Sequence, residues 1–154
     1  MKPFDVVIRR PEHLLLAGEH LFVSVHMGPT TLASVAAESH HARTKLGRTP
    51  RSVGCLVVLA EDVPPPPPEV RSALPRLLDE IAPVCAGLAM VIEGAGFRIA
   101  ALRAVFSGFL AIKRLPYRTA VFSRSAEGFD WLAQAVEIDP KGCERELQTL
   151  RAPR

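Results

Sequence analysis

One loop in the sequence has residue types and spacing suited to holding a small anion. Glu93, Gly94 and Gly96 follow the apolar run at 85–92, and Arg98 lies where a helix is expected to begin. Backbone N–H groups at a glycine-rich helix N-terminus can bind a phosphate or carboxylate, and an arginine adds a charge-assisted hydrogen bond. The third glycine of a dinucleotide fingerprint and the lysine of a phosphate-binding loop are missing. The absence of these two residues favours the alternative explanation, a tight strand-to-helix turn that needs positive φ angles.

The five histidines raise the question of a metal site. His40 and His41 are adjacent, and neighbouring residues on a helix point about 100° apart, so both do not face one ion comfortably. Glu38 and His41 are three positions apart, but a third ligand has to come from elsewhere. The remaining histidines lie in an expected hairpin and offer no ligand pair at helical spacing: His13, His20 and His26. The spacing therefore predicts no metal ligands and no bound cofactor.

The nucleophilic side chains show no catalytic pattern. Ser107 and Ser123 lack the glycines of a nucleophile elbow. Cys85 lies inside an apolar run, where a thiol stays protonated and unreactive. Glu61 and Asp62 are neighbours on an expected loop, which is typical of a solvated pair of charges. We therefore assign no catalytic residue and predict that the protein is not an enzyme.

Composition indicates a globular domain that does not bind nucleic acid. The chain has 154 residues, of which 48% are hydrophobic and 23% charged, and this length suits one hydrophobic core. The 19 basic and 16 acidic residues give a net charge of +3, and the basic residues are scattered along the chain. One local group could meet an anionic partner or simply be solvated: Arg43, Lys45, Arg48 and Arg51.

The cysteines and the N-terminal residues predict a cytoplasmic address. The three cysteines match no metal-ligand spacing, and their odd number favours a reducing compartment: Cys55, Cys85 and Cys143. Charged residues interrupt the N-terminal segment, so no apolar signal region is expected there. No run approaches the ~20 uncharged apolar residues of a membrane span.

Hydrophobic patterning predicts one α/β domain over residues 1–137, followed by a polar tail at 138–154 that is either partly helical or loose. Two continuously apolar runs, at 53–60 and 85–92, are typical of strands covered on both faces. Gly18-Glu19 separates two apolar runs and predicts an antiparallel hairpin. Further strands are expected at 4–9 and 118–122, and helices at about 30–47, 70–81, 97–114 and 123–136. The fold predicted is a single mixed sheet with an N-terminal hairpin and crossover helices.

The helix expected at 97–114 has one side made almost entirely of small uncharged residues. These are Ala100, Ala101, Ala104, Ser107, Gly108 and Ala111. A helix face in water normally carries Lys, Glu or Gln. Two explanations stay open: a helix packed between others or carrying exposed alanines, and a surface for another protein or a second copy. We expect self-association as a homodimer through this side.

Five consecutive prolines at 64–68 predict an extended polyproline II segment. Such a segment can dock into an aromatic groove of another protein. Its position between an expected core strand and an expected core helix favours a rigid connector.

The segment from Arg118 to Leu132 (RTAVFSRSAEGFDWL) resembles the closing strand and helix of SpoIIAA-like proteins of the STAS superfamily. The matching positions are Val121, Phe122, Glu127, Trp131 and Leu132. The order of expected strands and helices from Phe4 to Val136 is also similar to that fold.

The resemblance implies a bacterial regulatory or scaffolding domain that binds other proteins without chemistry of its own. In the anti-sigma-factor antagonists of this superfamily, an Asp-Ser pair follows the central strand and the serine is phosphorylated. Here that place reads Glu61-Asp62-Val63-Pro64, and the nearest downstream serine, Ser72, lies on the expected helix. A phosphorylation switch is therefore not carried over. The alternative function is binding of an anion, nucleotide or lipid at the loop from Glu93 to Arg98.

Overall fold

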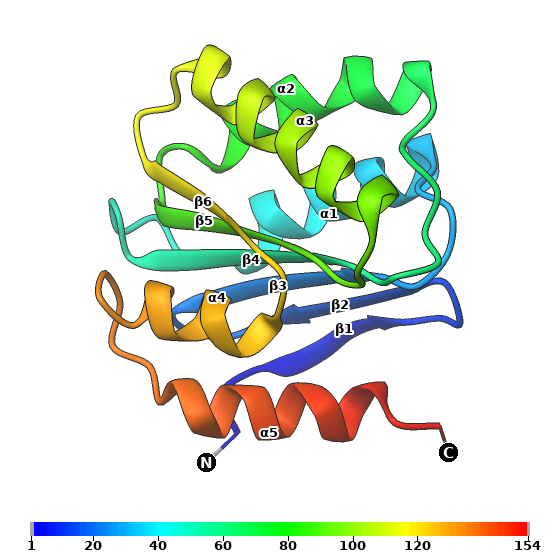
Figure 1. Ribbon diagram of the computed structural model, residues 1–154. Helices are drawn as coiled ribbons and strands as arrows, with labels where there is room; N and C mark the ends of the chain where they lie inside the picture. Colours follow the sequence, from blue (N-terminus) through cyan, green and yellow to red (C-terminus); the bar gives the residue numbers. More distant parts are fainter. Residues whose placement is uncertain (1, 154) are drawn as a thin grey trace.

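The computed structural model describes residues 2–153, which form one six-stranded sheet with helices on both faces (Figure 1). The strands are β1 (Asp5–Arg9), β2 (His13–Ala17), β3 (Leu21–His26), β4 (Val53–Leu59), β5 (Cys85–Ile92) and β6 (Arg118–Phe122). They are arranged in chain order; β1, β2 and β3 pair antiparallel, and β3 to β6 pair parallel. The prediction of an α/β fold with one mixed sheet and an N-terminal hairpin is confirmed.

The helices divide between the two faces of the sheet. On one side lie α1 (Leu32–Lys45), α2 (Pro68–Ile81) and α3 (Phe97–Lys113), and on the other lie α4 (Ser125–Leu132) and α5 (Pro140–Arg151) (Figure 1). Each of the first three helices links two adjacent parallel strands. Because such crossovers are right-handed and the strands advance in one direction, these helices share a face.

Side chains that alternate along the central strands pack into two separate hydrophobic cores, one on each face of the sheet. On β3, Leu21, Val23 and Val25 pack into the core beneath α4 and α5, whereas Phe22 packs into the core beneath α1 and α2. The same division holds on β4, where Leu56 and Cys55 belong to opposite cores. Side chains of a strand point alternately to its two faces, so each apolar run supplies both cores at once.

The C-terminal residues, expected as a polar tail, contain α5. This helix buries Cys143 and Leu147 in the core, and Ser125 on α4 donates a hydrogen bond to Glu144 Oε2 at 2.7 Å. The sequence concealed the helix because only a narrow apolar stripe interrupts its charged residues. Two or three buried positions per two turns are enough to fix a short helix against a sheet.

The proline segment connects β4 to α2 in extended conformation. Its last residue, Pro68, is the first residue of α2, where the missing N–H is of no consequence. Pro66 is buried, and Pro75 lies inside the helix without ending it. Within residues 2–153, none of the helices combines the length and the apolar character that crossing a bilayer requires.

Candidate functional site

The N-terminal hairpin brings two buried histidines together. In the antiparallel register of β2 and β3, His13 lies directly opposite His26. Their imidazole rings stack with centroids 4.7 Å apart and planes 9° from parallel. Ser24 is two residues before His26 and therefore shares its face of the sheet. The hairpin thus places two imidazoles and a hydroxyl at one point beneath α1.

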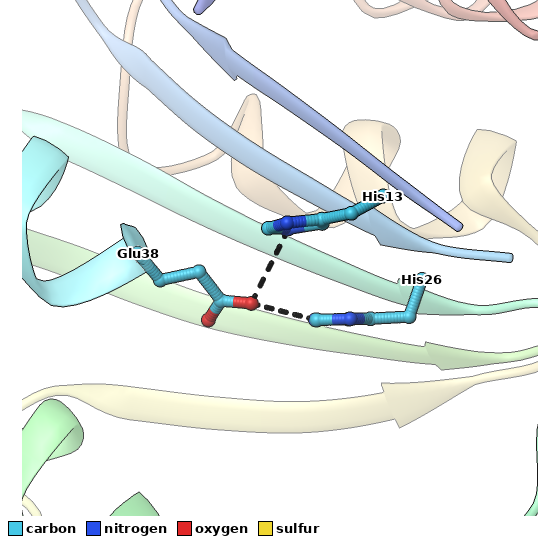
Figure 2. Close-up of side chains that lie close together, drawn as sticks. All are labelled: His13, His26 and Glu38. Carbon is cyan, nitrogen blue, oxygen red and sulfur yellow. Dashed lines mark ion pairs between the residues drawn. The ribbon is translucent and has the colours of Figure 1, made fainter. Parts of the chain in front are cut away.

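Glu38 reaches this point from α1. The helix begins at Leu32 because Thr31 caps it, its Oγ1 accepting a hydrogen bond from the Ser34 N–H at 3.1 Å. Glu38 follows two turns later on the side that faces the sheet, where it is 4% exposed. Figure 2 shows its carboxylate directed at both imidazoles.

The four side chains form a connected polar cluster. Glu38 Oε1 lies 2.6 Å from His26 Nε2 and 3.5 Å from His13 Nε2, and it accepts a hydrogen bond from Ser24 Oγ at 2.9 Å. Ser24 Oγ also lies 2.9 Å from His13 Nε2 and 3.3 Å from His26 Nε2. We call these residues, His13, Ser24, His26 and Glu38, the His–Glu cluster.

Electrostatics keep the Glu38 carboxylate charged inside the protein. Burial raises the pKa of Glu38, but the hydrogen bonds and charges of the two imidazoles outweigh burial and lower this pKa to about 2. A buried charge is tolerated only when it is paired and hydrogen-bonded. The cluster meets that condition, and its converging nitrogen and oxygen atoms can transfer a proton or ligate a cation.

The His–Glu cluster borders a cavity of about 70 Å³ that is partly open to solvent. Three polar residues, His26, Glu38 and Thr30, are among those that line it. The others are apolar and come mostly from β4, β5, α2 and α3, including Met90, Leu77 and Phe106. Thr30 is buried, and its Oγ1 has no hydrogen-bond partner among the described residues. The cavity has room for several water-sized groups, and its surface is almost entirely apolar.

The loop at 93–98 is held by two arginines of the same chain. The Arg151 guanidinium donates to both carboxylate oxygens of Glu93, at 2.6 and 2.9 Å. Arg103 donates to the carbonyl oxygens of Ile92 and Gly94.

Both glycines of this loop have positive φ, 110° at Gly94 and 99° at Gly96, as the tight-turn explanation requires. A Cβ at Gly94 would lie 2.7 Å from Glu61 Cγ. Arg98 is exposed on the first turn of α3, and binding of an anion here stays a prediction.

The small residues expected at an interface all face solvent: Ala100, Ala101, Ala104, Ser107, Gly108 and Ala111. The helix is therefore not packed between two others. Three large apolar side chains project among them and were not part of the prediction. Phe97 is 91% exposed, Val105 67% and Ile112 83%.

Two signals in the sequence point to the His–Glu cluster, although helical spacing does not. The first signal is the hairpin turn, which pairs Ala17 with Phe22. Counting four residues away from the turn on each strand, the same register pairs His13 with His26. Glu38 is a charged residue on the buried side of α1, between Val35 and Ala42. His40 and His41, in contrast, stack edge-to-face away from the cluster. Comparisons with family models, curated proteins and solved structures found no match.

Proposed function

We propose that this protein is a non-enzymatic interaction domain that self-associates through the outer side of α3. The observation that carries the proposal is an exposed apolar surface without charge, which we call the α3 face. Its residues are Phe97, Ala100, Ala101, Ala104, Val105, Gly108, Ala111 and Ile112. Apolar patches of this kind on a soluble protein mark interaction sites.

The α3 face occupies about half of the helix circumference at 100° per residue. Viewed down the helix axis, Arg98 lies at one edge of the α3 face and Ser107 at the other. The eight residues of the α3 face carry no charge. Ala100, Ala104 and Gly108 recur every four residues, so that the backbone of a second helix can approach closely between the large side chains. A two-fold axis would place the same surface on both copies, and an uncharged surface meets itself without repulsion.

Burial of the large side chains supplies the driving force. Removing Phe97, Val105 or Ile112 from water is worth about 1.5–3 kcal/mol each, and a symmetric dimer gains this on both copies. Alanine and glycine lose no side-chain entropy when they are covered. The α3 face therefore favours association with a second copy.

A regulatory or scaffolding role in the cytoplasm of a bacterium is the finer part of the proposal. Its support is the resemblance of residues 118–132 to SpoIIAA-like proteins of the STAS superfamily, whose members work by binding other proteins. All three cysteines are free and buried, which agrees with a reducing compartment.

Light scattering and sedimentation of the purified chain test the self-association. We expect the wild type to be dimeric at about 100 μM and Val105→Glu to weaken the dimer at least 100-fold, because a buried unpaired charge costs several kcal/mol. Val6→Glu is the matched control, since Val6 is also exposed but lies on β1 at the edge of the sheet. A monomeric wild type, or dissociation by Val6→Glu instead of Val105→Glu, would contradict the proposal.

The cavity supports a second candidate function, binding of a small apolar molecule with one polar group. The unpartnered Thr30 Oγ1 carries this candidate, because a ligand hydroxyl could satisfy it. We expect a short-chain alcohol to raise the melting temperature, and Thr30→Val to weaken its binding about three- to tenfold by loss of one hydrogen bond. Arg98→Ala should leave this binding unchanged. If Arg98→Ala removes the shift and Thr30→Val does not, the ligand binds at the loop of residues 93–98.

A further inference from the structure

The His–Glu cluster contains an arrangement of ligand atoms that fits one metal ion. We propose that His13, His26 and Glu38 bind a single transition-metal ion of the Zn²⁺ class. Each residue offers one ligand atom, and these three atoms all lie within 4.8 Å of one another. Two imidazoles and a carboxylate are a ligand set that Zn²⁺ accepts, with bonds of about 2.0–2.2 Å.

One of the two printed ligand-atom distances from Glu38 matches the edge of a tetrahedron around a metal ion, and the other is shorter. With bonds of that length, tetrahedral ligands lie roughly 3.3–3.5 Å apart. His13 Nε2 and Glu38 Oε1 are already 3.5 Å apart. His26 Nε2 and Glu38 Oε1, at 2.6 Å, need to separate by less than about 1 Å. The imidazole planes are only 9° from parallel, and an imidazole ligates in its own plane, so metal binding also requires rotation of at least one of the two rings in addition to the Glu38 side chain.

The scaffold fixes the ligands from three elements. His13 is on β2, His26 on β3 and Glu38 on α1, and each is at most 4% exposed. Ser24 Oγ lies 2.9 Å from Glu38 Oε1, 2.9 Å from His13 Nε2 and 3.3 Å from His26 Nε2. This hydroxyl therefore lies next to all three ligand atoms, and its hydrogen bond orients the Glu38 carboxylate. Rigid ligands held by a second layer of hydrogen bonds are the arrangement that metal sites require.

Metal binding at this point displaces a proton. The hydrogen between His26 Nε2 and Glu38 Oε1 leaves to solvent when the metal binds, because a ligating imidazole nitrogen must be unprotonated. The ion then takes the position of that proton and is neutralised in part by Glu38. Two of the three ligands, His26 and Glu38, also line the cavity. Thr30, whose Oγ1 has no hydrogen-bond partner among the described residues, lines the same cavity.

Metal titration of tag-free protein, first stripped with EDTA, tests the proposal. We expect one Zn²⁺ per chain by calorimetry, with a Kd at or below about 1 μM, and tetrahedral visible absorption when Co²⁺ replaces Zn²⁺. His26→Asn should weaken binding at least about 100-fold, since even outer partners of a metal ligand are worth 10–100-fold. The control is the double variant His40→Asn/His41→Asn, which removes the histidine pair away from the cluster and should bind normally.

A second measurement does not depend on folding of the variants. Nitrogen NMR of the wild-type histidines should show Zn²⁺ shifting two imidazoles, those of His13 and His26, and leaving His20, His40 and His41 unchanged. Absence of one-to-one binding, or shifts confined to His20, His40 and His41, would overturn the proposal. These results do not depend on the oligomeric state, so failure here is distinguishable from failure of the proposed self-association.

Discussion

Replacement of Glu38 by alanine, measured in EDTA, is expected to lower the free energy of unfolding by about 3–5 kcal/mol. The carboxylate lies 2.6 Å from His26 Nε2 and accepts the hydroxyl hydrogen of Ser24. Without Glu38, the imidazole and the hydroxyl lose their acceptor inside the protein. A buried donor left unpaired costs more than the net worth of its hydrogen bond.

Urea denaturation followed by circular dichroism measures this loss. Glu38→Gln should cost less than Glu38→Ala, because an amide oxygen of similar size still accepts a hydrogen bond. Glu19→Ala is the control in the hairpin turn, where the side chain is 88% exposed, and we expect a change within about 0.5 kcal/mol. If Glu38→Ala were as stable as the wild type, the His–Glu cluster would contribute nothing to folding.

Leu132→Ala is expected to destabilise the protein by about 2–5 kcal/mol. Leu132, the last residue of α4, is fully buried, and it packs against the sheet at Gly54. A Cβ built on Gly54 would lie 3.2 Å from Leu132 Cδ2, so the side chain fills the space that this glycine leaves. Truncation removes apolar contact and leaves a cavity that the rigid strands cannot close.

Leu32→Ala provides a matched comparison, since Leu32 is also helical but 52% exposed. We expect its free energy of unfolding to change by less than about 0.5 kcal/mol under the same denaturant titration. A cost below about 1 kcal/mol for Leu132→Ala would mean that α4 does not cover the sheet as described.

Local patterns were sufficient to predict most of the sheet. The strand at 85–92 was predicted at its observed limits because a strand buried on both faces is a continuous apolar run. The small uncharged residues on one side of α3 were recognised for a similar reason, since a helix face is a periodic property of one segment, but whether that side is packed or exposed was left open. The helix α5 was not predicted as part of the domain, because its burial depends on a few positions, Cys143 and Leu147 among them, in an otherwise polar sequence.

The His–Glu cluster could not be predicted from any single segment. Its ligand atoms come from two strands and a helix, so their meeting requires the hairpin register and the placement of α1 together. Register is recoverable from the turn, but the depth at which α1 docks is not. Helical spacing instead drew attention to His40 and His41, which lie away from the cluster.

Because α5 is the last element in the sequence, it is also the last to be synthesised. Adjacent strands are neighbours in sequence, so the sheet can assemble strand by strand as the polypeptide leaves the ribosome. The helix α5, which shares a core with Leu14 and Leu16 of β2, is synthesised last. It also contacts the first strand, because Arg9 donates a hydrogen bond to the Leu150 carbonyl oxygen. The earliest apolar surface of the nascent polypeptide therefore waits longest for its cover, and chaperones that shield hydrophobic segments during translation would act on it first.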